Sequence, residues 1–214
     1  MQKLVHKILP DYAVRPLILA VAANFLIYFG ASQLRGYLTF HSLSLGIDSQ
    51  IPFFAPFILF YLLAYVQWIA NYLLIAREGK SFCFHFIYGD IISKLICLLF
   101  FLFFPTTLVR PEVTGNGFCE QLVRLIYELD APVNLFPSIH CLESWCCIHA
   151  ALRMKKTPRW YLPVTIVMSF CVFASTLLVK QHVFVDIFGG IIVFEIGYLI
   201  AGMFPSLNLK RLRD

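Results

Sequence analysis

Residues 160–204 read WYLPVTIVMSFCVFASTLLVKQHVFVDIFGGIIVFEIGYLIAGMF. Two apolar runs, 160–180 and 184–204, are separated only by a short break that contains His182. A helix needs about 20 mostly apolar residues to cross the hydrocarbon core of a bilayer. Both runs reach that length, so this stretch predicts two membrane-spanning helices joined by a short connection.

The composition of the whole chain also indicates a membrane protein. Of the 214 residues, 60% are hydrophobic and 14% are charged, whereas roughly 25% are charged in a typical soluble domain. Too few charged residues remain to cover the surface of a soluble globule. The same balance excludes a disordered chain, a collagen-like chain and a small disulfide-stabilised scaffold.

Neither the cysteines nor the positive charge indicates a further ligand. The seven Cys are an odd number and show no C-x-x-C or zinc-like spacing, so we expect no metal or redox site. Cys119 is the one that we place in an outward-facing loop, and its pairing state is not predicted. The net charge of +5 comes from short basic clusters between apolar runs. That pattern is typical of membrane-protein loops, so we expect the lipid bilayer, and no nucleic acid, as a partner.

Four further segments complete a predicted all-α, polytopic bundle of six transmembrane helices in a single domain, 1–214. The additional spans are expected at 13–34, 52–76, 87–107 and 138–152. The last of them is shorter than a span and carries Ser138, His140, Glu143 and His149. Because polar side chains are costly at membrane depth, we expect this helix to lie inside the bundle.

The Lys and Arg residues determine the predicted orientation. They gather before the first span, at 77–80, at 153–159 and in the tail at 210–213. Cytoplasmic loops carry an excess of Lys and Arg, so we expect both termini in the cytoplasm of a multi-pass protein. The longest connection, 108–137, then lies outside. Its apolar residues recur at helical spacing over 118–129, which predicts an amphipathic helix at the outer surface.

Polar residues gather at the outer ends of the expected helices. Arg110 follows the third span, Ser138 and His140 open the fourth, and Lys180, His182 and Asp186 lie between the fifth and the sixth. Three separate regions of the sequence therefore bring polar side chains to one membrane face, where we expect the functional site.

The spacing of His182 and Asp186 suits catalysis by histidine. The two residues are four apart, so on a helix they share one face. A carboxylate there accepts the Nδ1–H of the imidazole, fixes its tautomer and leaves Nε2 as a nucleophile or base. The alternative is an interfacial pair that only satisfies its own hydrogen bonds.

Ser138 and Arg110 suit the binding of an anion. Ser138 is a natural helix N-cap, and the first turn of that helix would point N–H groups and its positive dipole end outward beside His140. Arg110 offers a fixed fork of donors for phosphate oxygens. Taken alone, these are an ordinary cap and a headgroup contact. Together with the histidines they supply the donors, nucleophile and acid that phosphoryl chemistry needs.

On these residues the chain resembles the type 2 phosphatidic acid phosphatase superfamily of lipid phosphatases. PSIH at 137–140 is followed by the pattern S-x6-H-x3-D at Ser175, His182 and Asp186, and Arg110-Pro111 matches the end of the family's first motif. The resemblance covers roughly 87–204 and extends to the six-helix layout. The expected location is a bacterial cell membrane, with the active site facing outward.

The resemblance implies a role for each matched residue. His182 attacks phosphorus and forms a phosphohistidine, and Asp186 orients His182. His140 protonates the leaving lipid alkoxide and then helps to activate water, while Arg110 and Ser138 hold phosphate oxygens. The substrate is a phosphorylated lipid, and no metal and no cofactor are implied.

Three positions depart from the family's pattern. Phe103 stands where the first motif has Lys, Thr176 where the third has Arg, and Ile139 where the second has Gly. Lys180, two residues before His182, is our own candidate to restore one phosphate-binding cation. These losses resemble the branch that contains inositol phosphorylceramide synthases and their bacterial relatives, which includes phosphotransferases.

Three functions therefore stay open. The first is hydrolysis of a lipid such as phosphatidic acid, phosphatidylglycerophosphate or a polyprenyl diphosphate. The second is transfer of a lipid headgroup to an alcohol. The third, motivated by the missing Lys and Arg, is a transporter or scaffold with a degraded site. Among the remaining charges, we expect Asp90 to pair with Lys94, Glu143 to contact His140, line the cavity or pack structurally, and Glu195 to serve packing.

Overall fold

The computed structural model describes residues 9–34, 36 and 38–204. Over these residues the regular elements are helices, and isolated bridges join His41 to Thr106 and Thr107 to Val133. The long helices are α2 (Asp11–Leu34), α4 (Ile58–Glu78), α5 (Lys80–Phe103), α7 (Ile139–Ala151), α8 (Tyr161–Leu178) and α9 (Phe184–Met203). The short ones are α3 (Gly46–Gln50), η2 (Ala55–Phe57) and α6 (Phe118–Leu129). The prediction of an all-α fold is confirmed for this part of the chain.

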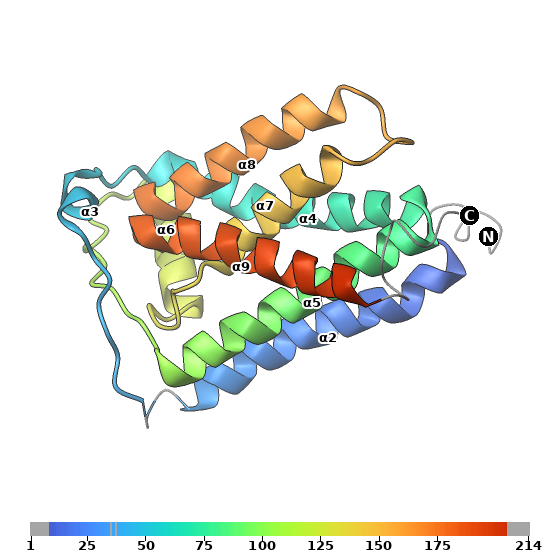
Figure 1. Cartoon of the computed structure of the whole chain (residues 1–214). Coiled ribbons are helices and arrows are strands. Elements are labelled where there is room, and N and C mark those ends of the chain that lie inside the picture. The colour runs from blue at the N-terminus through green and yellow to red at the C-terminus, as the bar shows by residue number, and fades with distance from the viewer. Residues whose placement is uncertain (1–8, 35, 37, 205–214) are drawn as a thin grey trace.

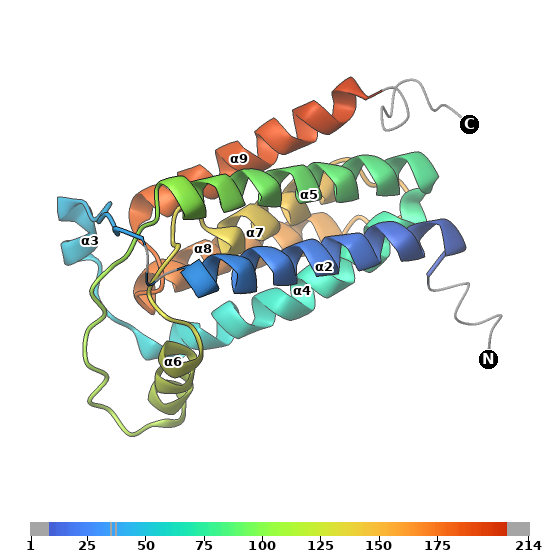
Figure 2. The same ribbon diagram turned by 90° about the horizontal axis from the view of Figure 1, so that it is seen from below.

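The long helices form one bundle and alternate in direction along the chain (Figure 1). In the view of Figure 2, α4 and α9 lie on opposite sides of the bundle, with α5 and α7 between them. The short helices α3 and α6 lie at one end, which we call the α6 end (Figure 1). The start of α2 and the end of α9 both lie at the opposite end (Figure 1).

Four helical segments are long and apolar enough to cross a membrane, judged by length and composition. They are Ala55–Glu78, Lys80–Phe103, Tyr161–Leu178 and Phe184–Met203, and they correspond to the expected spans 52–76, 87–107, 160–180 and 184–204. The expected spans 13–34 and 138–152 fall on α2 and α7, which are not in this set of four within the described residues. The four helices indicate a membrane protein, and a bundle of six crossings remains a prediction.

Helix α5 differs from its expected bounds of 87–107. It begins at Lys80 because Gly79, with a φ of 147°, breaks the chain immediately after α4. It ends at Phe103 because Phe104, with a φ of −141°, precedes Pro105, and a proline disfavours the helical conformation in the residue before it. Two apolar helices therefore follow each other with a single residue between them.

Helix α7 is the most enclosed helix of the bundle. It has 13 residues, and all of those from Cys141 to Ala151 are buried except Trp145. It packs against α4, α5, α8 and α9. The prediction that this short, polar segment lies inside the bundle is confirmed, and its polar side chains accordingly meet protein groups.

Glycines allow α9 to approach its neighbours closely. A Cβ atom on Gly190 would lie 2.5 Å from the carbonyl oxygen of Ser138 and 2.9 Å from the backbone nitrogen of Leu142. A Cβ atom on Gly197 would lie 2.6 Å from the carbonyl oxygen of Gly89 in α5. Small residues at such positions let membrane helices pack backbone to backbone. The contact at Gly190 brings the start of α9 against the start of α7.

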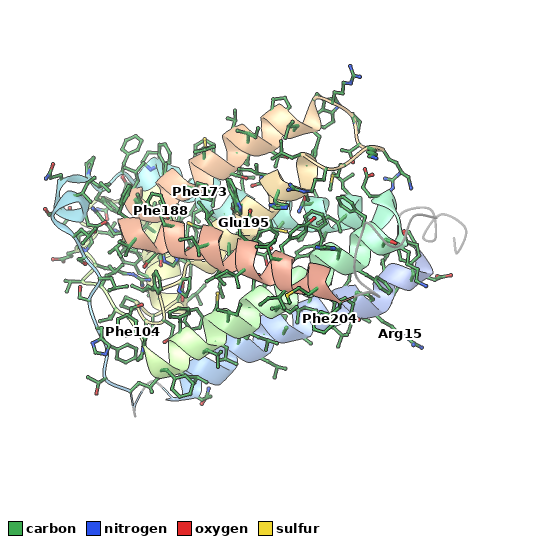
Figure 3. All side chains as sticks on the ribbon, viewed as in Figure 1. Arg15, Phe104, Phe173, Phe188, Glu195 and Phe204 are labelled. Carbon is green, nitrogen blue, oxygen red and sulfur yellow. The ribbon has the colours of Figure 1, made fainter. Side chains whose placement is uncertain are left out.

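Apolar side chains cover the outside of the bundle, and charged side chains are buried within it. Val66, Val167 and Ile192 are more than half exposed, and Phe188 lies on the outward side of α9 (Figure 3). Asp90 and Lys94, in contrast, are fully or almost fully buried. This distribution is the one expected of a protein whose solvent is lipid.

The long connection 108–137 contains α6 at the end of the bundle. Val123 of this helix is buried against η2 and α4, whereas Phe118 and Leu129 are 68% and 69% exposed. Exposed apolar side chains on an end helix suit contact with the surface of a bilayer. Its placement on the outer membrane surface remains a prediction.

The basic connections lie at the end opposite to α6 (Figure 1). The turn after α4 and the connection 152–160 are joined there by Glu78, whose carboxylate accepts the backbone N–H groups of Lys156 at 2.9 Å and Thr157 at 3.2 Å. The basic residues of 1–8 and 205–214, namely Lys3, Lys7, Lys210, Arg211 and Arg213, lie outside the described residues. The cytoplasmic location of both termini therefore remains a prediction.

Candidate active site

The predicted pair of His182 and Asp186 is present at the start of α9. Nδ1 of His182 lies 3.0 Å from Oδ2 of Asp186. The same oxygen accepts the backbone N–H of Val183, the N-cap of α9, at 3.1 Å. Asp186 is fully buried, so the first turn of the helix and the histidine ring hold its carboxylate in one orientation. This arrangement leaves Nε2 of His182 as the atom available for chemistry.

The PSIH segment lies directly against this pair. Ser138 is the N-cap of α7, and its Oγ accepts the backbone N–H of Cys141 at 3.3 Å. Its own N–H donates to the carbonyl oxygen of Asp186 at 3.2 Å. One backbone hydrogen bond thus joins the beginnings of α7 and α9. Ser138 is fully buried in its capping role and is not among the residues that line the cavity described below.

His140 stands in the first turn of α7 and faces His182. The centroids of the two imidazole rings are 5.9 Å apart. That separation lets a single tetrahedral group in the cavity contact both rings, because each ring nitrogen reaches about 3 Å. Two histidines from distant parts of the sequence are therefore brought to one place, as the motifs predicted.

Aromatic side chains of α4 surround His140. Tyr61 stacks on its ring with centroids 4.2 Å apart, and Trp68 lies edge-on at 5.2 Å. The hydroxyl of Tyr65 is 3.5 Å from Nε2 of His140. These residues were missed in the sequence analysis. Their spacing along the expected span 52–76 places them on one helical face, and this periodicity is the signal from which they could have been predicted.

A cavity of about 750 Å³ opens beside the two histidines at the α6 end. Its polar wall is formed by His140, His182, Gln181, Asp130, Asn134, Asn24 and Gln33. Aromatic and aliphatic side chains complete it, including Tyr61, Trp68, Phe101, Ile126 and Leu135. None of the described lining residues is a Lys or an Arg. Polar and apolar side chains contribute to the wall in similar measure, so the cavity offers contacts both for a polar group and for an apolar part of a ligand.

Arg110 lies behind this wall. Its guanidinium donates to the carbonyl oxygen of Asp130 at 2.6 Å and to the side-chain oxygen of Gln181, and it stacks over the ring of Tyr127 with Cζ 4.5 Å from the centroid. Burial raises the pKa of Tyr127 to about 12, although the charge of Arg110 opposes that shift. The phenol therefore stays protonated and donates to the carbonyl oxygen of Val179 at 2.9 Å. Arg110 orients Gln181, the neighbour of His182.

Lys180 is not brought to the histidine pair. Its φ of 51° turns the chain after α8, and its ammonium donates to the carbonyl oxygens of Asp48 at 3.0 Å and Ile51. The side chain therefore holds the connection around α3. The geometry gives no support to its predicted role as a replacement for a phosphate-binding cation.

The other departures from the family pattern do not add a cation either. Phe103 is 80% exposed at the end of α5, and the hydroxyl of the buried Thr176 donates to the carbonyl oxygen of Phe173 at 2.8 Å. Ile139 lines the cavity. Within the described ranges, no group of three or more His, Cys, Asp or Glu side chains is placed to hold a metal ion.

Comparisons of the chain with protein-family models, with curated proteins and with solved structures gave no match. The resemblance to the type 2 phosphatidic acid phosphatases therefore rests on the motif residues alone.

Proposed function

We propose that this protein is a membrane enzyme that cleaves the phosphate ester of a lipid at the cavity between His140 and His182. The observation that carries the proposal is the pairing of His182 with the buried carboxylate of Asp186, 3.0 Å away. The ring of His182 also lines the same cavity as a second histidine, His140, with the ring centroids 5.9 Å apart. The basic connections lie at the other end of the bundle, which favours an outward-facing site under the positive-inside rule.

The chemistry follows from the available atoms. Nε2 of His182 attacks phosphorus, so that an N–P bond forms and the bond between phosphorus and the lipid oxygen breaks. Nδ1–H stays hydrogen-bonded to Asp186, whose negative charge stabilises the positive phosphohistidine ring. Protonated His140 gives its proton to the leaving alkoxide. Neutral His140 then takes a proton from water as the water oxygen attacks phosphorus, which frees phosphate and returns His182 to its starting state.

Transfer of a headgroup to an alcohol is the second candidate reaction of the same site. It is favoured by the lack of Lys and Arg among the described residues that line the cavity, where Asp130 adds a negative charge. A phosphodiester carries one negative charge and needs less neutralisation than a phosphomonoester dianion. In this reaction an alcohol takes the place of water in the second step, and the neutral polar side chains Asn24, Gln33 and Asn134 suit its hydroxyl groups.

The test is a substrate panel with purified protein in lipid nanodiscs. Phosphatidic acid, phosphatidylglycerophosphate and a polyprenyl diphosphate test hydrolysis by release of inorganic phosphate. Phosphatidylinositol with an added lipid alcohol tests headgroup transfer. We expect turnover of one lipid class that is abolished in His182→Ala and retained in His41→Ala, an exposed histidine in the connection after α2. Turnover that survives His182→Ala would contradict the proposed role of His182 as the nucleophile. No reaction with any of these lipids would contradict the proposal and favour a non-catalytic transporter or scaffold.

A further inference from the structure

A second cavity of about 330 Å³ adjoins the first one. It lies between α2 and α4 and is lined by Leu17, Ala20, Val21, Asn24, Tyr65, Trp68, Ile69, Tyr72, Leu73, Lys94 and Glu143. Three of these residues, Asn24, Tyr65 and Trp68, also line the cavity at the histidines. The two spaces therefore share a wall, and we call the second one the slot.

The sides of the slot are apolar and open toward the surrounding lipid. Leu17, Ala20 and Val21 form one face of α2, and Ile69 and Leu73 belong to α4. Val21 is 56% exposed and Ile69 is 63% exposed, so the mouth of the slot lies on the outer surface of the bundle. Leu17 and Asn24 are two helical turns apart, which gives the slot a length of about 10 Å along α2.

The floor of the slot is charged. Nζ of Lys94 lies 2.5 Å from Oε1 of Glu143 and 2.9 Å from Oδ2 of Asp90. The hydroxyl of Tyr72 lies 2.7 Å from Oδ2 of Asp90 and 3.0 Å from Oε2 of Glu143. Lys94, Asp90 and Glu143 are at least 95% buried. The predicted pair of Asp90 and Lys94 is thus present, and Glu143 joins this pair at a distance from the histidines.

We propose that the slot holds one hydrocarbon chain of the lipid whose phosphate reaches His140 and His182, and that the Tyr72–Lys94–Glu143 floor sets the longest chain that fits. The inference rests on the proposed function. A chain that leaves the bilayer gains little from burial in another apolar space, since lipid tails are as apolar as the slot. The shape of the slot is decisive in such a case. The part of the chain that lies inside the slot ends at the ion cluster, which offers further methylene groups no favourable contact.

Filling the slot tests the proposal. Ala20 is 3% exposed in its wall, so Ala20→Phe places a ring where the chain would lie. The matched control is Ala22→Phe, on the same helix but exposed and outside both cavities. For the lipid class that the wild type turns over, Ala20→Phe should lower kcat/KM for a long-chain substrate by about 10-fold or more. It should leave a water-soluble short-chain analogue unaffected, and Ala22→Phe should leave both unaffected.

A second variant tests the proposal without a bulky side chain, which could impair folding. Leu17→Ala enlarges the slot, so the longest chain that is turned over at the full rate should increase by one or more methylene groups. An equal loss of long-chain and short-chain turnover in Ala20→Phe, or an unchanged chain-length profile in Leu17→Ala, would overturn the proposal while leaving the proposed function intact.

Fluorescence gives a measurement that does not need turnover. In a protein with Trp145→Phe and Trp160→Phe, Trp68 at the shared wall is the remaining tryptophan. Phosphatidic acid with brominated chains should quench Trp68, and Ala20→Phe should reduce that quenching whereas Ala22→Phe should not. Equal quenching in both variants would overturn the proposal that a lipid chain occupies the slot. Loss of quenching in Ala20→Phe without turnover of any lipid would support the slot and count against the proposed reaction alone.

Discussion

The imidazole rings of His140 and His182 lie with their centroids 5.9 Å apart, although one ring belongs to the start of α7 and the other precedes α9. The environments of the two rings differ. His182 is held by the carboxylate of Asp186, whereas His140 is stacked on Tyr61 and enclosed by aromatic side chains. A ring that is hydrogen-bonded to a carboxylate suits the nucleophile, and a ring enclosed by aromatic side chains suits proton transfer. Substitutions of the two residues should therefore impair different steps of the reaction.

Trapping the phosphohistidine intermediate should distinguish the role of His140 from that of His182. With a substrate labelled at phosphorus, the wild type should carry an acid-labile phosphoryl group on histidine. His182→Ala should show neither label nor turnover. His140→Asn should lower turnover by roughly 10²–10⁴-fold, the usual contribution of a general acid or base, and should still accept label, because the nucleophile remains. Label in His182→Ala, or an unimpaired rate in His140→Asn, would contradict these roles.

Asp186 should matter through the orientation of His182. Asp186→Asn keeps the size of the side chain but removes the charge that fixes the ring and stabilises the phosphohistidine, and we expect kcat to fall by on the order of 10³–10⁴-fold. The matched control is Asp48→Asn. Oδ1 of Asp48 also accepts a backbone N–H at the start of α9, that of Phe184 at 2.7 Å, but its other oxygen accepts the N–H of Leu45 at 2.7 Å. Similar losses of kcat in the two variants would mean that Asp186 serves only as a structural cap of α9. Single-turnover kinetics with the trapped label measure the effect.

Much of the fold and of the histidine pair could be predicted because the signals are local. Long apolar runs such as 184–204 identify helices by length alone, and the spacing of His182 and Asp186 defines a helical face. The enclosure of α7 also followed from its own polar residues. The start of α5 at Lys80 was missed because polar residues at a helix end lower the hydropathy without ending the helix.

The surroundings of the histidines could not be predicted because they depend on which helices meet. The aromatic residues of α4 reach His140 only through the packing of α4 on α7, and Glu143 joins Lys94 only because α7 also meets α5. Lys180 lies two residues from His182 in sequence, yet its positive φ directs the chain so that its ammonium reaches the connection at Asp48. Sequence proximity at a turn does not determine the direction of a side chain.

Gly190 should be required for the site to assemble. A methyl group at this position would lie 2.5 Å from the carbonyl oxygen of Ser138, so Gly190→Ala must move α9 away from α7 and with it His182 away from His140. We expect loss of most activity and a lower Tm. Gly30→Ala, in α2, is the control, because no atom lies within 4 Å of the added methyl group and alanine is the better helix former. Wild-type activity in Gly190→Ala would show that the two helix starts need not touch.

Gln181 should report whether an anion occupies the cavity. Its oxygen accepts from Arg110, and it lines the cavity beside His182. Gln181→Leu removes this hydrogen bond with Arg110 and should raise KM. Gln181→Glu keeps a partner for Arg110 but places a negative charge near the substrate, so it should raise KM further if that substrate is a phosphate anion. A milder effect of Glu than of Leu would mean that the bound group carries no negative charge at this wall.

The ion cluster around Lys94 should stabilise the bundle independently of the reaction. Lys94 lies between two carboxylates, with Nζ 2.9 Å from Asp90 and 2.5 Å from Glu143. Lys94→Met would leave both carboxylates buried without their cation, and breaking a buried pair from one side costs about 3–5 kcal/mol. Lys94→Met combined with Glu143→Gln should recover part of that loss, because one uncompensated charge is removed as well. Unfolding in detergent, followed by circular dichroism, measures the difference between the single and the double variant. Equal Tm values for these two variants would mean that Glu143 is already neutral once Lys94 is removed, and would contradict the expected recovery.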